Sequence, residues 1–150
     1  MKKFLSTFFL ASMMLSAYAG LGLTFVTVDE NEEDIVTTIT KDTTFIVTNY
    51  EEDWDGNPEM TAKGEASSTS NKITVTIERS AEGLNDQFCL GACLQGNGEK
   101  TQVEELTLGP LNIWFTHFYP TEPSETTIAY TFDDGVNPAI TLTIKYSYLM

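Results

Sequence analysis

The sequence holds little of the chemistry that most metal and catalytic sites need. Its 150 residues include one histidine, His117, and two cysteines, Cys89 and Cys93. A blue-copper site takes two histidines and a cysteine, and a closed zinc site would have to recruit carboxylates here. A serine triad would depend on His117, yet no nucleophile-elbow motif is present. We therefore expect a protein that is not an enzyme and that has no cofactor.

Basic residues are also scarce. The chain has 8 Lys and Arg residues against 22 Asp and Glu residues, which gives a formal net charge of −14. Nucleic acids and anionic membranes are bound through clusters of Lys and Arg, whereas the basic residues here are scattered. No nucleic-acid partner is therefore expected. The acidity favours solubility, and it also suits Ca²⁺ or a cationic partner.

The first twenty residues, MKKFLSTFFLASMMLSAYAG, have the three parts of a secretory signal peptide. A lysine pair precedes an apolar segment over 4–15, and the small-x-small sequence Ala-Tyr-Ala predicts cleavage between Ala19 and Gly20. The apolar segment is short for a membrane span and is interrupted by Ser and Thr. We predict a helical signal peptide over 1–19 and an exported chain over 20–150. That chain would be periplasmic, on the outer surface or secreted, and would not be an integral membrane protein.

Apolar and polar residues alternate along most of the mature chain, which is typical of half-buried antiparallel strands. In KITVTIER, for example, Ile73, Val75 and Ile77 should face a core. Turn residues separate the runs, as in DDGVNP over 133–138. The pattern predicts an all-β fold: one immunoglobulin-like antiparallel β-sandwich of about seven to nine strands over 20–150. Strong strands are expected over 23–28, 34–40, 43–49, 72–79, 126–132 and 139–148, and weaker ones over 60–66, 101–108 and 113–119.

The two cysteines lie close together in the segment NDQFCLGACLQG (85–96). Export would place Cys89 and Cys93 in an oxidising compartment, where a disulfide is the default. Gly91 between them permits the tight bend that a short loop needs. We expect a disulfide that clips a loop. Two alternatives stay open: a redox centre, although such centres usually have C-x-x-C at a helix start, and half of a metal site.

The segment NIWFTHFYP (112–120) is the main candidate for binding. Trp114 and Phe118 would share one face of a strand, while His117 and Tyr119 would share the other. Because both faces are apolar, one can belong to the core and the second to a protein or glycan partner. The alternative is that both faces are buried.

The acidic segment EEDWDGNPEM (51–60) offers a second candidate. Trp54 has little to pack against in such a loop, so it can serve recognition. Asp53, Asp55 and Asn57 could form an irregular Ca²⁺ loop, although an EF-hand is excluded because Ala62 occupies the position of the bidentate Glu. The alternative is an acidic turn without metal.

Three stretches together resemble a known kind of exported module: SNKITVTIERSAEGLNDQFCLGAC, FTHFYPTE and IAYTFDDGVNPAITLTIKY. The chain is similar over residues 64–148 to immunoglobulin-like β-sandwich modules of Gram-negative bacteria. Those modules have a QFCxGxC loop after a ϕTVTϕER-like strand, an F…YxP stretch and a hairpin of the YTFxDxxNPxxSVTVTY kind. The resemblance implies a surface or secreted accessory domain of a family without assigned function. Such modules often precede a sorting domain or anchor, which the ending KYSYLM does not resemble.

The predicted function is that of an exported, non-enzymatic β-sandwich. It would act as an interaction or accessory module with a protein partner in the cell envelope. The alternative is a small glycan- or Ca²⁺-binding module that uses the acidic loops and exposed aromatic residues.

Overall fold

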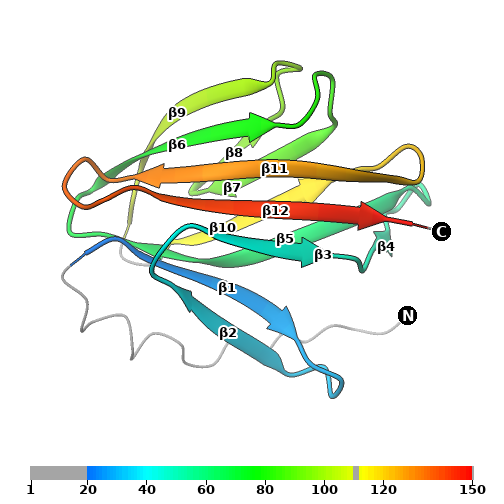
Figure 1. The fold of residues 1–150 in the computed structure, drawn as a ribbon, viewed down its shortest axis with the longest axis horizontal. Coiled ribbons are helices and arrows are strands. Elements are labelled where there is room, and N and C mark those ends of the chain that lie inside the picture. The colour runs from blue at the N-terminus through cyan, green and yellow to red at the C-terminus, as the bar shows by residue number, and fades with distance from the viewer. Residues whose placement is uncertain (1–19, 110–111, 150) are drawn as a thin grey trace.

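A computed structural model of the chain describes residues 20–109 and 112–149. These residues form a β-sandwich of two sheets, and this part of the chain contains strands and loops without a helix (Figure 1). No helix among the described residues is therefore a candidate for crossing a bilayer. The predicted signal peptide over 1–19 lies outside the described residues, so it stays a prediction.

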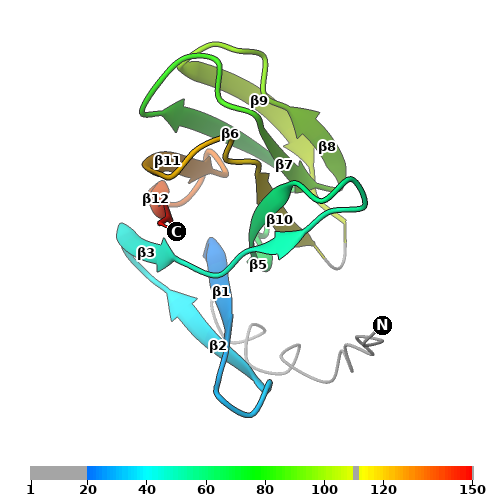
Figure 2. The same cartoon turned by 90° about the vertical axis from the view of Figure 1, so that its right-hand side faces the viewer.

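The two sheets divide the strands as follows. The first sheet has the order β2-β1-β5-β10-β7-β8, with β4 paired to the start of β5, and the second has the order β3-β12-β11-β6-β9. Figures 1 and 2 show the two layers from perpendicular directions. The strands are β1 (Gly22–Val28), β2 (Asp34–Ile39), β3 (Thr43–Val47), β4 (Glu51–Glu52), β5 (Pro58–Ser67), β6 (Lys72–Arg79), β7 (Asp86–Leu90), β8 (Ala92–Gln95), β9 (Thr101–Thr107), β10 (Ile113–Phe118), β11 (Ser124–Asp133) and β12 (Ile140–Tyr148).

The predicted all-β sandwich is confirmed, and each of the nine expected strands is present within a few residues of its predicted bounds. The described residues form twelve strands in place of the predicted seven to nine. Strands β4, β7 and β8 were not expected, because β4 has two residues and because Gly91 made the cysteine segment resemble a loop. That segment is a hairpin at the edge of the first sheet.

One edge pair departs from the antiparallel arrangement of the other strands. Strand β3 pairs in parallel with β12, with Ile144 opposite Phe45. The chain leaves β2 in the first sheet and enters β3 in the second across residues 40–42. Alternation shows which residues face the core, but it carries no information on strand direction, so the sequence could not reveal this pairing.

The core lies between the sheets and is built from the inward residues of both. Ile73, Val75 and Ile77 are buried there, as predicted. Aromatic rings join the two layers: Phe88 of β7 stacks on Tyr130 of β11 with ring centroids 5.2 Å apart. Removing these side chains from water provides the main stabilisation of the sandwich.

A close approach between strands fixes the position of Trp114. Its indole N–H donates a hydrogen bond of 3.0 Å to the carbonyl of Thr24 on β1. Gly64 on β5 lies between them, and a Cβ at this position would be 1.8 Å from the Thr24 oxygen. The missing side chain of Gly64 therefore lets three neighbouring strands, β1, β5 and β10, close over the tryptophan ring.

Candidate functional site

The cysteine segment forms the β7–β8 hairpin. Cys89 and Cys93 are directly opposed residues in this hairpin and are joined by a disulfide, as predicted. Gly91 forms the turn with a φ of 75°, which a glycine adopts without strain. The hairpin is thus locked at its tip, and the disulfide holds the short edge strand β8 on the sheet.

Strand β10 has one core face and one outer face. Trp114, Thr116 and Phe118 are buried between the sheets, whereas Phe115, His117 and Tyr119 are partly exposed on the outer side of the first sheet. Trp114 has no exposed surface, so we do not include it in the candidate site. His117 and Tyr119 do lie on the accessible face.

The outer residues of β10 contact one acidic side chain. Glu59 of β5 contacts His117 through its Oε1 atom and accepts a hydrogen bond of 3.3 Å from the Tyr119 hydroxyl. The His117 and Tyr119 rings are nearly parallel, with centroids 6.0 Å apart. Burial, with a smaller effect of the Glu59 charge, raises the pKa of Tyr119. The hydroxyl is therefore a neutral hydrogen-bond donor at physiological pH.

An apolar row crosses the whole outer face of the first sheet. Consecutive cross-strand pairs place six residues side by side, from edge strand β8 to edge strand β2. The row ends at the exposed Val36 on β2. The one charged residue within the row, Lys63, forms an ion pair of 3.8 Å with Asp34. In order, the row is Cys93, Cys89, Phe115, Lys63, Val26 and Val36.

The acidic loop between β4 and β5 is organised by Asp53. Its Oδ1 atom accepts hydrogen bonds from the backbone N–H groups of Asp55 (2.9 Å) and Asn57 (2.8 Å). The backbone and side-chain hydrogen bonds from Asn57 lower the pKa of Asp53. The Asn57 carbonyl accepts from the N–H of Asp53, so the three Ca²⁺ candidates, Asp53, Asp55 and Asn57, do lie together. These contacts make a self-contained turn, and Ca²⁺ binding here stays a prediction.

Trp54 is fully exposed in the same loop, and its role in recognition stays a prediction. A shallow cleft of about 510 Å³ lies beside the loop, with Asp53, Asn85, Tyr119 and Pro120 among its lining residues. Among the described residues, no three His, Cys, Asp or Glu side chains are grouped as metal ligands. The lining of this cleft offers the ring of Tyr119, the amides of Asn57 and Asn85 and the carboxylate of Asp53 to a polar ligand.

The β1–β2 hairpin extends away from the body of the sandwich (Figure 2). The first five residues of β2, Asp34 to Thr38, are exposed, and so is Val28 at the end of β1. Glu30, Glu32 and Glu33 are exposed at its tip. The tip is folded around Asp29, whose carboxylate accepts hydrogen bonds from the N–H groups of Asn31 and Glu33. The hairpin thus combines exposed apolar side chains with an acidic turn.

Acidic loops gather at one end of the sandwich, on the right in Figure 1. Strand direction places the β1–β2 turn, the loop around Asp53, and the loops after β6, β8 and β10 at this end. Besides the acids of the hairpin tip, these segments contribute five further glutamates to this end: Glu51, Glu52, Glu82, Glu99 and Glu122. Among the described residues of these loops, the basic residue is Lys100. We call this surface the acidic end.

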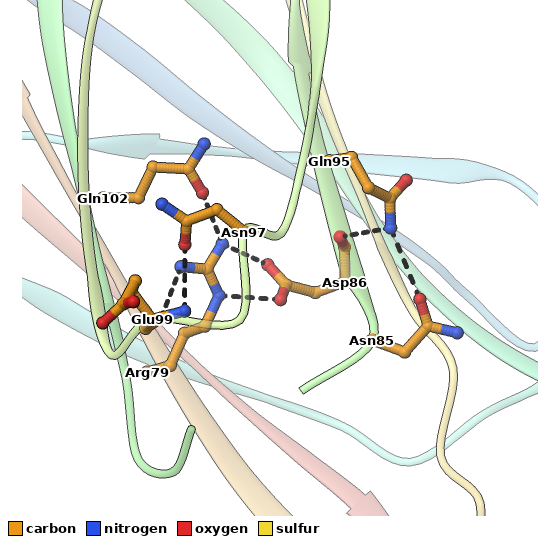
Figure 3. A network of polar contacts seen from close by, with 7 residues as sticks. All are labelled: Arg79, Asn85, Asp86, Gln95, Asn97, Glu99 and Gln102. Atoms are coloured by element: carbon orange, nitrogen blue, oxygen red, sulfur yellow. Dashed lines mark hydrogen bonds and ion pairs between the residues drawn. The ribbon is translucent and has the colours of Figure 1, made fainter. Parts of the chain in front are cut away.

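A buried polar network supports the acidic end from inside (Figure 3). The Arg79 guanidinium donates two hydrogen bonds to the Asp86 carboxylate, at 2.7 and 3.0 Å, and neither side chain is exposed. It also donates to Gln102 (2.9 Å) and to the Glu99 carbonyl (3.1 Å). The network ties the ends of β6, β7 and β9 to the loop after β8. The sequence pattern does not predict this network, and an Arg at the end of an otherwise alternating strand is the one available signal.

Comparisons with known proteins identify the fold but no family. No protein-family model matches the sequence, and no curated protein is significantly similar to it. Among solved structures, the fold is similar to that of the N-terminal domain of PorA, with a TM-score of 0.53. The sequences are 16% identical, and the match covers 84% of this chain and 96% of the PorA chain. At this identity, the likeness shows a shared β-sandwich fold alone.

Proposed function

We propose that this chain is an exported, non-enzymatic β-sandwich module of the cell envelope that acts by binding another protein. The observation that carries the proposal is the exposed β1–β2 hairpin, where large apolar residues stand in water instead of in the core. Exposed apolar clusters mark contact surfaces in soluble proteins. The intramolecular disulfide supports export, because disulfides persist mainly in oxidising compartments.

The fold is similar to that of the N-terminal domain of PorA, which is one domain of a larger protein. This similarity supports a role as a module. The resemblance to the exported immunoglobulin-like modules of Gram-negative bacteria points the same way. Together with the scarcity of histidine and cysteine, these features favour an accessory protein over an enzyme and over a nucleic-acid-binding protein.

The test is in-cell crosslinking of the tagged protein in its native host, followed by affinity capture. A tagged exported protein of similar size and charge serves as the control. We expect a small, reproducible set of envelope proteins that the control does not capture. Capture of the same background from both proteins would reject the interaction module.

A second candidate function is glycan binding, and the full exposure of Trp54 beside the Tyr119 cleft favours it. A sugar ring could stack on the indole while Asn85 and Asp53 hydrogen-bond its hydroxyl groups. Glycan-array binding of the wild-type protein should then be lost in the Trp54→Ala variant.

Thermal unfolding with and without Ca²⁺, compared between wild type and Asp53→Asn, tests the Ca²⁺ alternative. No effect of glycans or Ca²⁺ would reject both ligands.

A further inference from the structure

The sandwich has four edge strands, and they differ in how they are protected from pairing with other chains. Natural edge strands are protected by short length, by charged residues or by neighbouring segments. Strand β8 has four residues and is clipped by the disulfide, and β9 carries two adjacent glutamates, Glu104 and Glu105. Strand β3 has five residues, and the ring of its Phe45 stacks on Phe25 of β1. Strand β2 has none of these features along Ile35 to Ile39.

Among the described residues, no strand pairs with the outer edge of β2, so its backbone can accept a further strand. At the hairpin turn, the N–H of Asp29 donates to the carbonyl of Glu33, so these residues form a hydrogen-bonded pair. Hydrogen-bonded and non-hydrogen-bonded pairs alternate along an antiparallel ladder. The residues Val36 and Thr38 therefore direct their N–H and C=O groups away from β1, toward the open edge. The ladder with β1 is regular over six pairs, without a bulge that would twist this edge away.

The side chains of β2 would hold an added strand by apolar contact on both faces. Val36 lies on the outer face, at the end of the apolar row, and Ile35 lies on the opposite face; they are 43% and 48% exposed. Val28 at the end of β1 is 57% exposed beside them. An added strand with apolar residues on both of its faces could cover Val36 and Ile35 while it satisfies the outward backbone groups of β2.

Charge at the hairpin indicates what kind of strand fits. The tip carries Glu30, Glu32 and Glu33 next to the start of β2, and the whole chain has a net charge of −14. A second copy of this chain would bring the same excess of negative charge and would be repelled. A segment with Lys or Arg at the end nearest the tip would be attracted.

We infer that β2 is a docking strand for an extended, basic segment of a partner protein, which joins the first sheet at this edge. Backbone hydrogen bonds to β2 would provide affinity, the apolar contacts would set the register, and the acidic tip would select a cationic end. The inference rests on the proposed function and names the surface and the partner chemistry for it.

Site-specific photo-crosslinking in the native host tests the surface. The photoreactive amino acid p-benzoylphenylalanine replaces Val36 on β2 or, as the matched control, the exposed Val103 on edge strand β9. We expect position 36 to capture a basic, extended segment of another protein, identified by mass spectrometry, and position 103 to capture none. Capture of a second copy of this chain, or of an acidic or helical segment, would overturn the inference.

The same experiment separates failure of the inference from failure of the proposed function. If affinity capture gives a partner but position 36 gives no crosslink, then the protein binds elsewhere and only the docking strand is rejected. If neither method captures a partner, then both are rejected.

A synthetic peptide with the sequence of the crosslinked segment then tests the mechanism. Val36→Pro removes the outward N–H of β2 and should weaken peptide binding about tenfold or more, whereas Val36→Thr keeps that donor and should bind nearly as wild type does. A second variant replaces the tip acids (Glu30→Gln, Glu32→Asn, Glu33→Gln) and leaves the strand intact. Peptide binding to this variant should be weaker and should depend less on salt concentration. Circular dichroism checks that each variant is folded. Equal affinity for wild type, the Pro variant and the tip variant would contradict strand addition.

Discussion

At the scale of residues, the buried Arg79–Asp86 pair should be sensitive to substitution. Both side chains are fully buried, so each charge depends on the other and on its hydrogen bonds. Asp86→Asn would leave the guanidinium buried without a counter-charge. We expect a loss of about 3–5 kcal/mol in the free energy of unfolding, measured with denaturant.

The control for this prediction is Glu105→Gln, which breaks the exposed ion pair of 2.6 Å between Lys72 and Glu105. That variant should change the free energy of unfolding by less than about 1 kcal/mol, because exposed pairs are screened by water. Similar losses in the two variants would show that Arg79 does not depend on Asp86.

Asp134 should make stability depend on pH. Burial alone would raise its pKa, but hydrogen bonds from the Ser68 hydroxyl, Asn137 and the N–H of Val136 lower the pKa from its ordinary value of 3.8 to about 2. The carboxylate therefore stabilises the fold above about pH 4, by about 2 kcal/mol. This contribution is lost as the pH falls from 4 to 2.

The measurement is the free energy of unfolding of wild type and Asp134→Asn between pH 2 and 7. The wild type should be more stable at pH 7, and the difference should shrink as the pH falls through 4 toward 2. The exposed Asp55→Asn serves as the control. A difference between wild type and Asp134→Asn that is constant with pH would contradict this role of the carboxylate.

At the scale of elements, alternation was enough to predict where most strands lie. KITVTIER, for example, forms β6 with the predicted bounds and the predicted inward face. Alternation could not show which side enters the core where both faces of a strand are apolar, as in IWFTHF. In such a strand, the side that enters the core depends on which sheet lies opposite. The partners of Arg79 and Gly64 were unpredictable for the same reason: each contact joins residues that are brought together only by the order of strands in a sheet.

Gly64 should be intolerant of any side chain. A Cβ would meet the Thr24 carbonyl at 1.8 Å and Trp114 at 2.7 Å, so strands β1, β5 and β10 would have to separate. Gly64→Ala should lower the free energy of unfolding by about 3 kcal/mol or more. Gly109→Ala, where the nearest atom would be 3.8 Å away, is the control and should be nearly neutral. Equal thermal stability of the two variants would contradict the close approach.

The disulfide should contribute modestly to stability and not to any reaction. Because the loop between Cys89 and Cys93 is short, replacing both residues by serine should cost roughly 2 kcal/mol in the free energy of unfolding. Partner binding should persist, because the hairpin lies at the opposite edge of the first sheet from β2. Loss of a thiol–disulfide exchange activity in the double variant would instead show that the pair is a redox centre.

At the scale of the whole molecule, the sequence showed how much negative charge the protein carries but not where it lies. The strand order collects the acidic turns at one end, beside the free edge of β2. An interaction module built in this way should bind its partner more weakly as salt increases, since exposed charges are screened within about a nanometre at physiological ionic strength. Charge and edge together support the proposed role in binding, which the composition alone could only suggest.

The most direct test of the central claim, that this protein works by binding another protein, is isothermal titration of the purified chain over residues 20–150 with its purified captured partner at low and at physiological salt. We predict saturable binding that weakens as salt increases and that is reduced by Val36→Pro. The absence of any heat of binding at both salt concentrations, with both proteins folded, would contradict the account.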